Sequence, residues 1–105
     1  MVGSNNNLPT QLPILEHKNW DKWCVQMRVL LKFQGVLDIV MFRYQEVSEG
    51  SLVVEIAAQI ENEKKDCKAL FLLHQSVDTT NFNKIIVATT MNEAWEILEK
   101  CHVGA

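Results

Sequence analysis

Residues 66–77 constrain the fold most, because at their centre Ala69 is followed by four large apolar residues at 70–73. In a helix, such a run leaves no solvated face over one turn, so we expect other helices to pack on several sides of it. The preceding residues 61–68 are rich in Glu, Lys and Asp and contain no Gly or Pro, which favours a helix over a strand. The stretch predicts the buried central helix of an all-α domain, with Leu70, Phe71 and Leu73 in the core.

Length and composition favour one soluble globular domain. The chain has 105 residues, of which 48% are hydrophobic, and no apolar run approaches the roughly 20 residues that cross a bilayer. The formal net charge of −3 provides no broad basic surface for a phosphate backbone, so nucleic-acid binding is not expected of this segment. The polar, uncharged first residues do not resemble a signal peptide, and the expected location is cytoplasmic.

The prolines divide the chain into two parts. Residues 1–18 lack helical periodicity and contain Pro9 and Pro13, which predicts a flexible or extended N-terminal arm. In this arm, Leu12 and Leu15 are the apolar side chains expected to dock on the domain or on a neighbouring molecule. Residues 19–105 are predicted to form a single helical domain.

Apolar residues at three- and four-residue steps predict a compact bundle of about five helices. The first helix begins at a cap, Asn19, and ends at Gly35. A short second helix or turn covers 36–42. A third helix over 51–77 would be longer than a domain of this size, so it either bends near 62–65 or projects at one end.

Two shorter elements complete the predicted bundle. A short helix is expected around residues 82–86. Thr90 and Glu93 have the spacing of a capping box and begin the final helix, which directs Trp95 and Leu98 inward and ends near Gly104.

The sequence contains no recognisable catalytic or cofactor motif. The glycines are too far apart for a phosphate-binding loop, and no nucleophile elbow is present. His74 and Asp78 would share a helix face, but an interior histidine is the favoured interpretation. Cys67 and Cys101, together with the histidines, lack the short spacing of zinc sites. No catalytic residue, metal or cofactor is therefore predicted, and the three cysteines are expected to be reduced and buried.

The tryptophans allow two interpretations. Trp20, Trp23 and Trp95 at helical spacing are most often core anchors. Trp20 and Trp23, with Met27 on the same helix, are also the best candidates for a protein-binding surface, because they lie beside the N-terminal arm.

Three segments resemble the Gag polyprotein of copia-type LTR retrotransposons. The first joins an arm, Leu12-Pro13-Ile14-Leu15, to Asn19-Trp20-Asp21-Lys22-Trp23, Met27 and Leu30-Leu31. The second is Asp66-Cys67-Lys68-Ala69-Leu70 followed by His74-Gln75-Ser76-Val77. The third is similar to the Thr-x-x-Glu-Ala-Trp-x-x-Leu signature and reads Thr89-Thr90-Met91-Asn92-Glu93-Ala94-Trp95-Glu96-Ile97-Leu98-Glu99. The resemblance covers about residues 12–104, in order. It departs from the family pattern at Trp20, where Tyr is common, and around 36–37, where a Trp is usual.

The resemblance implies a capsid domain, similar to a retrotransposon capsid N-terminal domain, that associates with itself into a shell. The zinc knuckle that binds RNA in such polyproteins does not occur in these 105 residues, so RNA packaging is not expected of this segment. The alternative is a host-adopted Gag derivative that holds a peptide or partner protein in an apolar groove.

Overall fold

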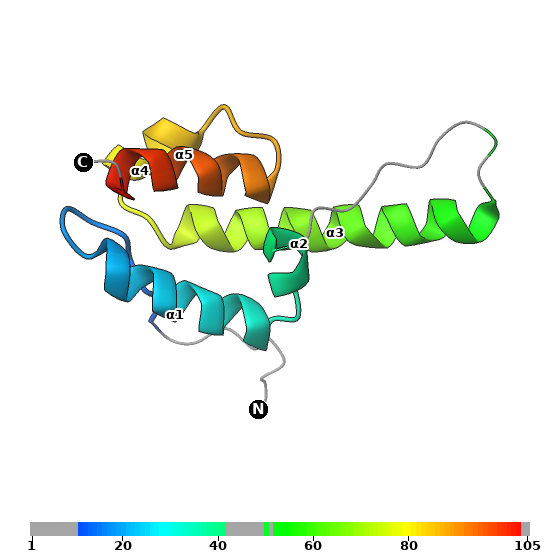
Figure 1. Ribbon diagram of the computed structural model, residues 1–105, viewed down its shortest axis with the longest axis horizontal. Coiled ribbons are helices and arrows are strands. Elements are labelled where there is room, and N and C mark those ends of the chain that lie inside the picture. Colours follow the sequence, from blue (N-terminus) through cyan, green and yellow to red (C-terminus); the bar gives the residue numbers. More distant parts are fainter. Residues whose placement is uncertain (1–10, 42–49, 51, 104–105) are drawn as a thin grey trace.

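The computed structural model describes residues 11–41, 50 and 52–103 and confirms an all-α fold. Its five helices are α1 (Trp20–Phe33), α2 (Leu37–Met41), α3 (Val53–Gln75), α4 (Thr79–Ile85) and α5 (Met91–Val103) (Figure 1). Within the described residues there is no β-strand, and one isolated parallel bridge pairs Leu15 with Val77.

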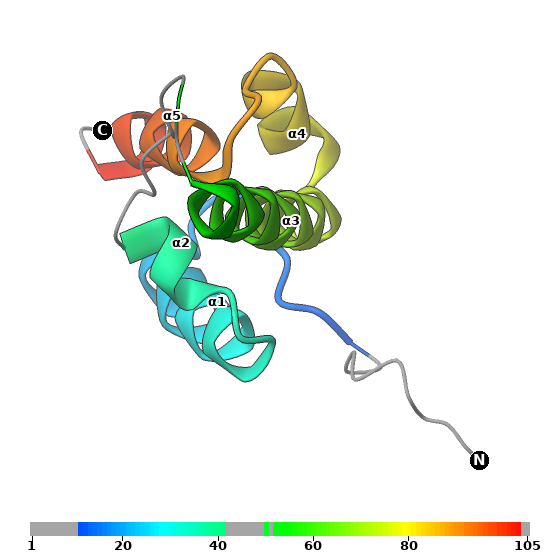
Figure 2. The ribbon, with the colours of Figure 1, turned by 90° about the vertical axis from the view of Figure 1, so that its right-hand side faces the viewer.

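The helix α3 lies at the centre of the bundle. α1 and α2 lie on one side of it, and α4 and α5 lie on the other (Figures 1 and 2). An ion pair of 3.6 Å between Lys65 Nζ and Asp38 Oδ2 joins α3 to α2, and Lys68 Nζ donates to Gln34 O, just after α1, at 3.1 Å. The predicted central helix is therefore present.

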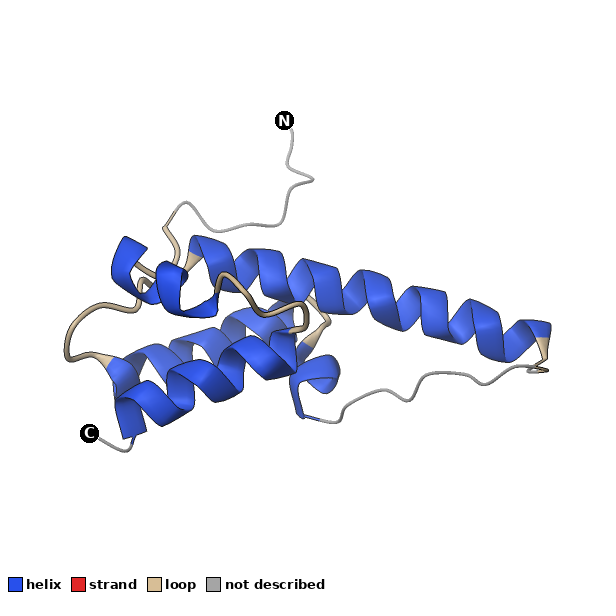
Figure 3. Ribbon diagram, turned by 90° about the horizontal axis from the view of Figure 1, so that it is seen from above, coloured by secondary structure: helices blue, strands red, loops and turns tan. Residues whose placement is uncertain are grey.

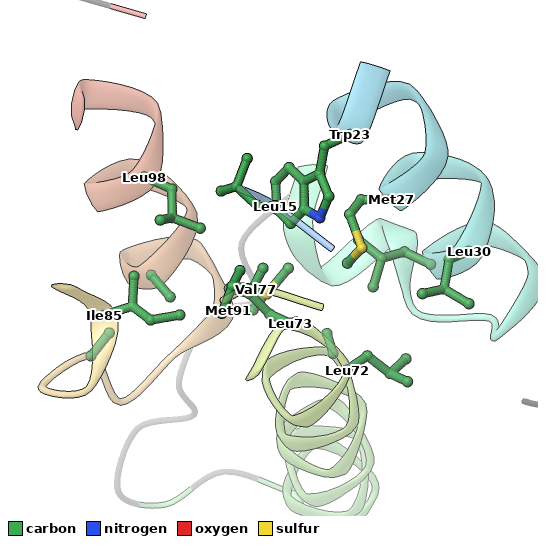
Figure 4. Packing of buried hydrophobic residues seen from close by; sticks show 14 of the residues in the cluster. Leu15, Trp23, Met27, Leu30, Leu72, Leu73, Val77, Ile85, Met91 and Leu98 are labelled. Atoms are coloured by element: carbon green, nitrogen blue, oxygen red, sulfur yellow. The ribbon is translucent and has the colours of Figure 1, made fainter. Parts of the chain in front are cut away.

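One apolar cluster fills the space between α3 and its neighbours (Figure 4). Its fully buried members come from the N-terminal segment and from α1, α3, α4 and α5, and include Leu15, Trp23, Met27, Leu31, Leu73, Ile85, Met91 and Leu98. Leu70 and Trp95 are only partly buried and pack against this cluster. Four of the five predicted core residues therefore belong to the core or line it.

Phe71 was predicted in the core and is 54% exposed, so that prediction is wrong. The helix packs against neighbours through Ala69, Leu72 and Leu73, and each residue is turned by about 100° from the one before it. Phe71 consequently faces away from Leu72 and Leu73, on a side of α3 that no described element covers. A run of large apolar residues therefore does not mean that every side of the helix is packed.

The long helix does not break. α3 continues through 62–65 over 23 residues, which corresponds to about 34 Å at ~1.5 Å per residue. Its N-terminal half extends beyond the rest of the bundle (Figures 1 and 3). Here Val53 is 83% exposed and Ile60 is 49% exposed. The structure therefore has the projecting end, rather than the bend, of the two predicted alternatives.

The helix ends agree only in part with the predicted caps. Gly35 follows α1 with a φ of 77°, as expected of a left-handed stop. Asn19 makes no side-chain cap; its Oδ1 accepts from Glu16 N and its Nδ2 donates to Ile14 O, each at 2.8 Å. At α5, Thr90 Oγ1 accepts from Glu93 N at 3.2 Å, but the Glu93 carboxylate accepts from the backbone N of Thr89 instead of Thr90. Gly104 and residues 1–10 lie outside the described residues.

The two neighbouring residues of α3 allow a direct test of this packing. Leu73→Ala is expected to lower the free energy of unfolding by about 2 to 5 kcal/mol, because Leu73 is 0% exposed and its loss leaves a cavity. Phe71→Ala is the matched control and should change it by about 0.5 kcal/mol or less. Urea denaturation followed by circular dichroism at low protein concentration measures both. Equal losses would show that Phe71 is packed within the same molecule.

Candidate functional site

The N-terminal segment is fixed to the bundle where α3 ends. Leu15 N donates to Ser76 O at 2.8 Å, and Leu15 O accepts from Asp78 N at 3.0 Å. Trp23 Nε1 donates to the same Ser76 carbonyl at 2.8 Å, and both its indole ring and the Leu15 side chain are 0% exposed. We call these contacts of Leu15 and Trp23 with residues 76–78 the Leu15 bridge. It satisfies a carbonyl just beyond the end of α3 that has no helical partner.

Four rings next to this bridge join α1 to α5. The Trp20 ring lies 5.5 Å from that of Trp23, 5.8 Å from that of Trp95 and 5.2 Å from that of His102, between ring centroids. Trp20 and His102 are nearly parallel, with an interplanar angle of 3°. The tryptophans therefore act as anchors between helices, and only Trp20, Trp95 and His102 of the four rings are partly exposed.

A chain of hydrogen bonds runs from His102 to the start of α4. Asn81 Nδ2 donates to Asp78 Oδ1 at 2.9 Å and to Leu15 O at 3.3 Å, so Asn81 Oδ1 is left to accept from His102 Nε2, at 2.8 Å. Asp78 Oδ1 also accepts from Asn81 N at 2.9 Å and so caps α4. Burial is the main cause that lowers the pKa of His102; the positive charge of Lys84 adds to this, and Asp78 opposes it.

A wide, open hollow of about 1050 Å³ lies beside Trp20 and His102. Most of the residues that line it are polar or charged by type, and they include Lys22, Asp78 and Lys84, but Trp20 and Val103 also contribute apolar surface. The hollow therefore differs from a groove lined only by apolar side chains, and Trp20 forms part of its wall.

The predicted protein-binding residues are mostly buried. Leu15, Trp23 and Met27 are each 0% exposed, so they stabilise the fold and are not available to a partner. Leu12 is half-buried against the core, and Trp20 is half-buried at the hollow. Of the five candidates, only these two have accessible surface.

The larger exposed apolar surface lies on other faces of α1 and α3. On α1, Val25, Val29 and Phe33 are 62%, 64% and 68% exposed and are spaced four residues apart, so they form one stripe. This stripe is absent from the predicted binding residues, because the tryptophans on the opposite face of α1 are the more conspicuous apolar side chains. The four-residue spacing itself was the signal that could have found it.

The residues considered for chemistry do not form one site. His74 Nε2 is buried with no hydrogen-bond partner in the described part of the chain, and the ring meets Phe82 edge-on, with centroids 5.1 Å apart. Asp78 instead caps α4. No group of three or more His, Cys, Asp or Glu residues that could hold a metal ion occurs within residues 11–41, 50 and 52–103.

The cysteines are free but not buried as predicted. Cys67 and Cys101 are exposed and Cys24 is half-buried. Burial raises the pKa of the Cys24 thiol to about 11, against the smaller lowering effect of Arg28. Cys67 is exposed because it lies on the side of α3 that faces away from Ala69, and Cys101 is exposed in the last turn of α5.

Asp66 is a buried acid that the sequence did not single out. It is 4% exposed, and its Oδ1 accepts from Met91 N, at the first residue of α5, at 3.1 Å. Burial raises the pKa of this carboxyl, and the hydrogen bond from Met91 opposes the increase. The side chain therefore fixes α5 to α3, while burial makes its ionised form less favourable in the folded state than in the unfolded state.

Asp66→Asn should remove a pH dependence of stability. Above the ordinary pKa of 3.8, the folded state still holds a proton that the unfolded state has released, so stability falls as pH rises until the folded pKa is passed. Asparagine keeps an acceptor oxygen for Met91 N but cannot ionise, so the stability of the variant relative to the native chain should increase over this window. Thermal unfolding measured from pH 3 to 7 tests it.

Glu61→Gln is the control for this measurement, because Glu61 is an exposed carboxylate on the projecting part of α3. It should not reproduce the trend of Asp66→Asn. A difference between Asp66→Asn and the native chain that stays constant with pH would contradict the role given to the buried carboxyl.

The chain has no match among known proteins in these comparisons. No protein-family model matches it, and neither do any of the curated proteins or solved structures compared with it. None of the described helices combines the length and the apolar character needed to cross a membrane. The copia-type Gag resemblance therefore remains a prediction from sequence motifs.

Proposed function

We propose that this domain functions in protein–protein association, by binding other copies of itself as capsid-type domains of Gag polyproteins do in shell assembly. The observation that carries the proposal is the projecting half of α3. Val53, Ile56 and Ile60 are 83%, 43% and 49% exposed there, beyond the reach of the bundle. Exposed apolar side chains that are grouped on one face, rather than scattered, are typical of interaction surfaces.

The order of charges on α3 favours a second copy as the partner. Glu55, Glu61 and Glu63 lie in the projecting half, and Lys64 is the first of three lysines that follow. The same helix therefore presents an acidic segment and a basic segment, which complement each other between two identical chains. The motifs shared with copia-type Gag support the same assignment.

A second exposed stripe favours assembly beyond a dimer. Val25, Val29 and Phe33 lie on α1, which packs on a different side of the bundle from α4 and α5 (Figure 2). A closed pair needs one self-complementary surface, whereas a shell needs at least two distinct contacts on each subunit. The α1 stripe could supply the second contact.

The alternative function is a module that binds a peptide, and the hollow beside Trp20 is the feature that supports it. That hollow is open, but its wall carries charged groups such as Lys22, Lys84 and Asp78. It fits an apolar peptide poorly. A chain that is strictly monomeric and binds one defined peptide beside Trp20 would favour this function over assembly.

Self-association should be measurable by sedimentation velocity or light scattering. The weight-average mass is expected to rise with concentration over the micromolar range and to rise further in ammonium sulfate, because this salt strengthens apolar burial. A chain that stays monomeric at high micromolar concentration, with no assembly at raised salt, contradicts the proposed function.

Two aspartate substitutions test the exposed apolar side chains of α3 and the stripe on α1. Ile60→Asp on α3 and Val29→Asp on α1 should each weaken self-association about tenfold or more, which corresponds to ~1.4 kcal/mol, because a charge would be buried in the contact. Ala58→Asp is the matched control, since Ala58 is exposed on the same part of α3 but points away from the stripe. Association that is unaffected by both stripe variants would contradict the use of these surfaces.

A further inference from the structure

One exposed apolar face runs along α3 from Val53 to Phe71. At 100° per residue, five side chains fall within about 60° of one another around the helix. They are Val53, Ile56, Ile60, Cys67 and Phe71. All are exposed, including Cys67 and Phe71, which lie on the half of α3 that packs in the bundle. We call this set the α3 face. Among the described residues, nothing covers it.

The bundle leaves this face open because α3 uses other positions for packing. Ala69, Leu72 and Leu73 face the core, and the Asp66 carboxylate accepts a hydrogen bond from Met91 N of α5. The face therefore extends from the free end of α3 at Val53 to Phe71 in the packed half, a length of about 27 Å at ~1.5 Å per residue. That is long enough for a helix-to-helix contact of several turns.

The charges along α3 change sign near its middle. Before residue 64 the charged residues are Glu55, Glu61 and Glu63, and all three are exposed. The lysines that follow are partly engaged within the molecule: Lys65 pairs with Asp38, and Lys68 donates to Gln34 O. Lys64 is exposed and makes no ion pair among the described residues. An identical helix running in the opposite direction would set acidic residues beside basic ones.

The shape of the molecule also selects the antiparallel direction. The other helices gather at the C-terminal half of α3 and leave its N-terminal half free (Figures 1 and 3). Two parallel copies of α3 would bring both bundles to the same end, where they would compete for space. Two antiparallel copies place each free half along the exposed face of the other chain's packed half.

We propose that α3 pairs with α3 of a second copy, antiparallel, about a two-fold axis that passes near residues 63 and 64. Ile60 then lies opposite Cys67 of the second copy, and Ile56 lies opposite its Phe71. Glu63 lies level with Lys64 of the second copy. The contact is symmetric, so each pairing occurs twice. This inference rests on the proposed function of self-association and adds the geometry of one contact.

Cysteine cross-linking tests the register. In a chain that carries Cys101→Ser, I60C should form a disulfide with the natural Cys67 of the second copy, because such a bond requires Cα atoms about 4.4 to 6.8 Å apart. Mild oxidation should give a dimer on a non-reducing gel, and peptide mass spectrometry should identify the I60C to Cys67 linkage. Both positions are exposed, so I60C should keep the helical circular dichroism spectrum of the native chain.

Two controls isolate the proposed contact. A58C in the same background is exposed on α3 but points away from the α3 face, and it should cross-link about tenfold more slowly or not at all. I60C combined with Cys67→Ser should lose the dimer band. A disulfide between the two I60C positions, rather than with Cys67, would indicate a different register and would overturn the proposal.

A charge exchange gives a second, independent measurement. Lys64→Glu should weaken dimerisation several-fold, because Glu63 of the second copy then meets a like charge. Adding Glu63→Lys to Lys64→Glu should restore it, because the pair is then opposite in sign again. Failure of the double variant to recover any affinity would count against the pairing.

The outcomes separate this inference from the proposed function. If sedimentation shows self-association but I60C cross-links no faster than A58C, the α3 pairing is wrong and the assembly function stands. If the chain stays monomeric under all conditions, both are wrong. A fast I60C to Cys67 linkage together with charge-exchange recovery supports both.

Discussion

The fold depends on a single carbonyl group just beyond the end of α3. Ser76 O accepts one hydrogen bond from Leu15 N and another from the buried indole of Trp23, each at 2.8 Å. Three segments that are distant in the sequence meet there: the N-terminal segment, α1 and the C-terminal end of α3. A buried carbonyl without partners would cost about 1 to 3 kcal/mol, so these two donors make the arrangement strongly preferred over alternatives that separate the segments. Leu15, Trp23 and Val77 then supply apolar burial around the same point.

Fixing the bundle at this end leaves the two halves of α3 in different environments. The C-terminal half is held by the Leu15 bridge, by Asp66 at α5, and by Lys65 and Lys68 at α2 and α1. The N-terminal half receives none of these contacts. A helical segment this short is barely stable alone in water, because most helix stability in proteins comes from packing. The N-terminal half therefore stays helical because it continues the packed C-terminal half of α3. A partner bound along its apolar side would stabilise it directly.

The positions of the main helices could be predicted from the sequence, but which side of each helix is buried could not. Periodicity placed α1, α3 and α5 correctly, because residues such as Trp23, Met27 and Leu98 recur at helical steps and are in fact buried. It failed at Phe71, where composition alone suggested burial, because only the positions of α1, α2, α4 and α5 determine which side of α3 is covered. Similarly, the sequence allows Trp23 to be either a core anchor or a contact residue and offers Leu15 as a contact residue, because a hydrogen bond between residues 23 and 76 leaves no trace in local spacing. Asp66 was missed for the same reason: its partner, Met91, lies 25 residues away.

The basic segment of α3 would connect association to the stability of the bundle. Lys65 and Lys68 already hold Asp38 and Gln34 O, so they reduce the negative potential around α2 and around the carboxyl end of α1. In the proposed antiparallel pair, Glu63 of a second copy would approach Lys64, the direct neighbour of Lys65. Any partner that binds the folded chain and not the unfolded chain adds to the free energy of unfolding in proportion to the logarithm of its concentration. The contacts of α3 within the chain are concentrated at its C-terminal half. If α3 pairs as proposed, the stability of its N-terminal half would therefore depend on the concentration of identical chains.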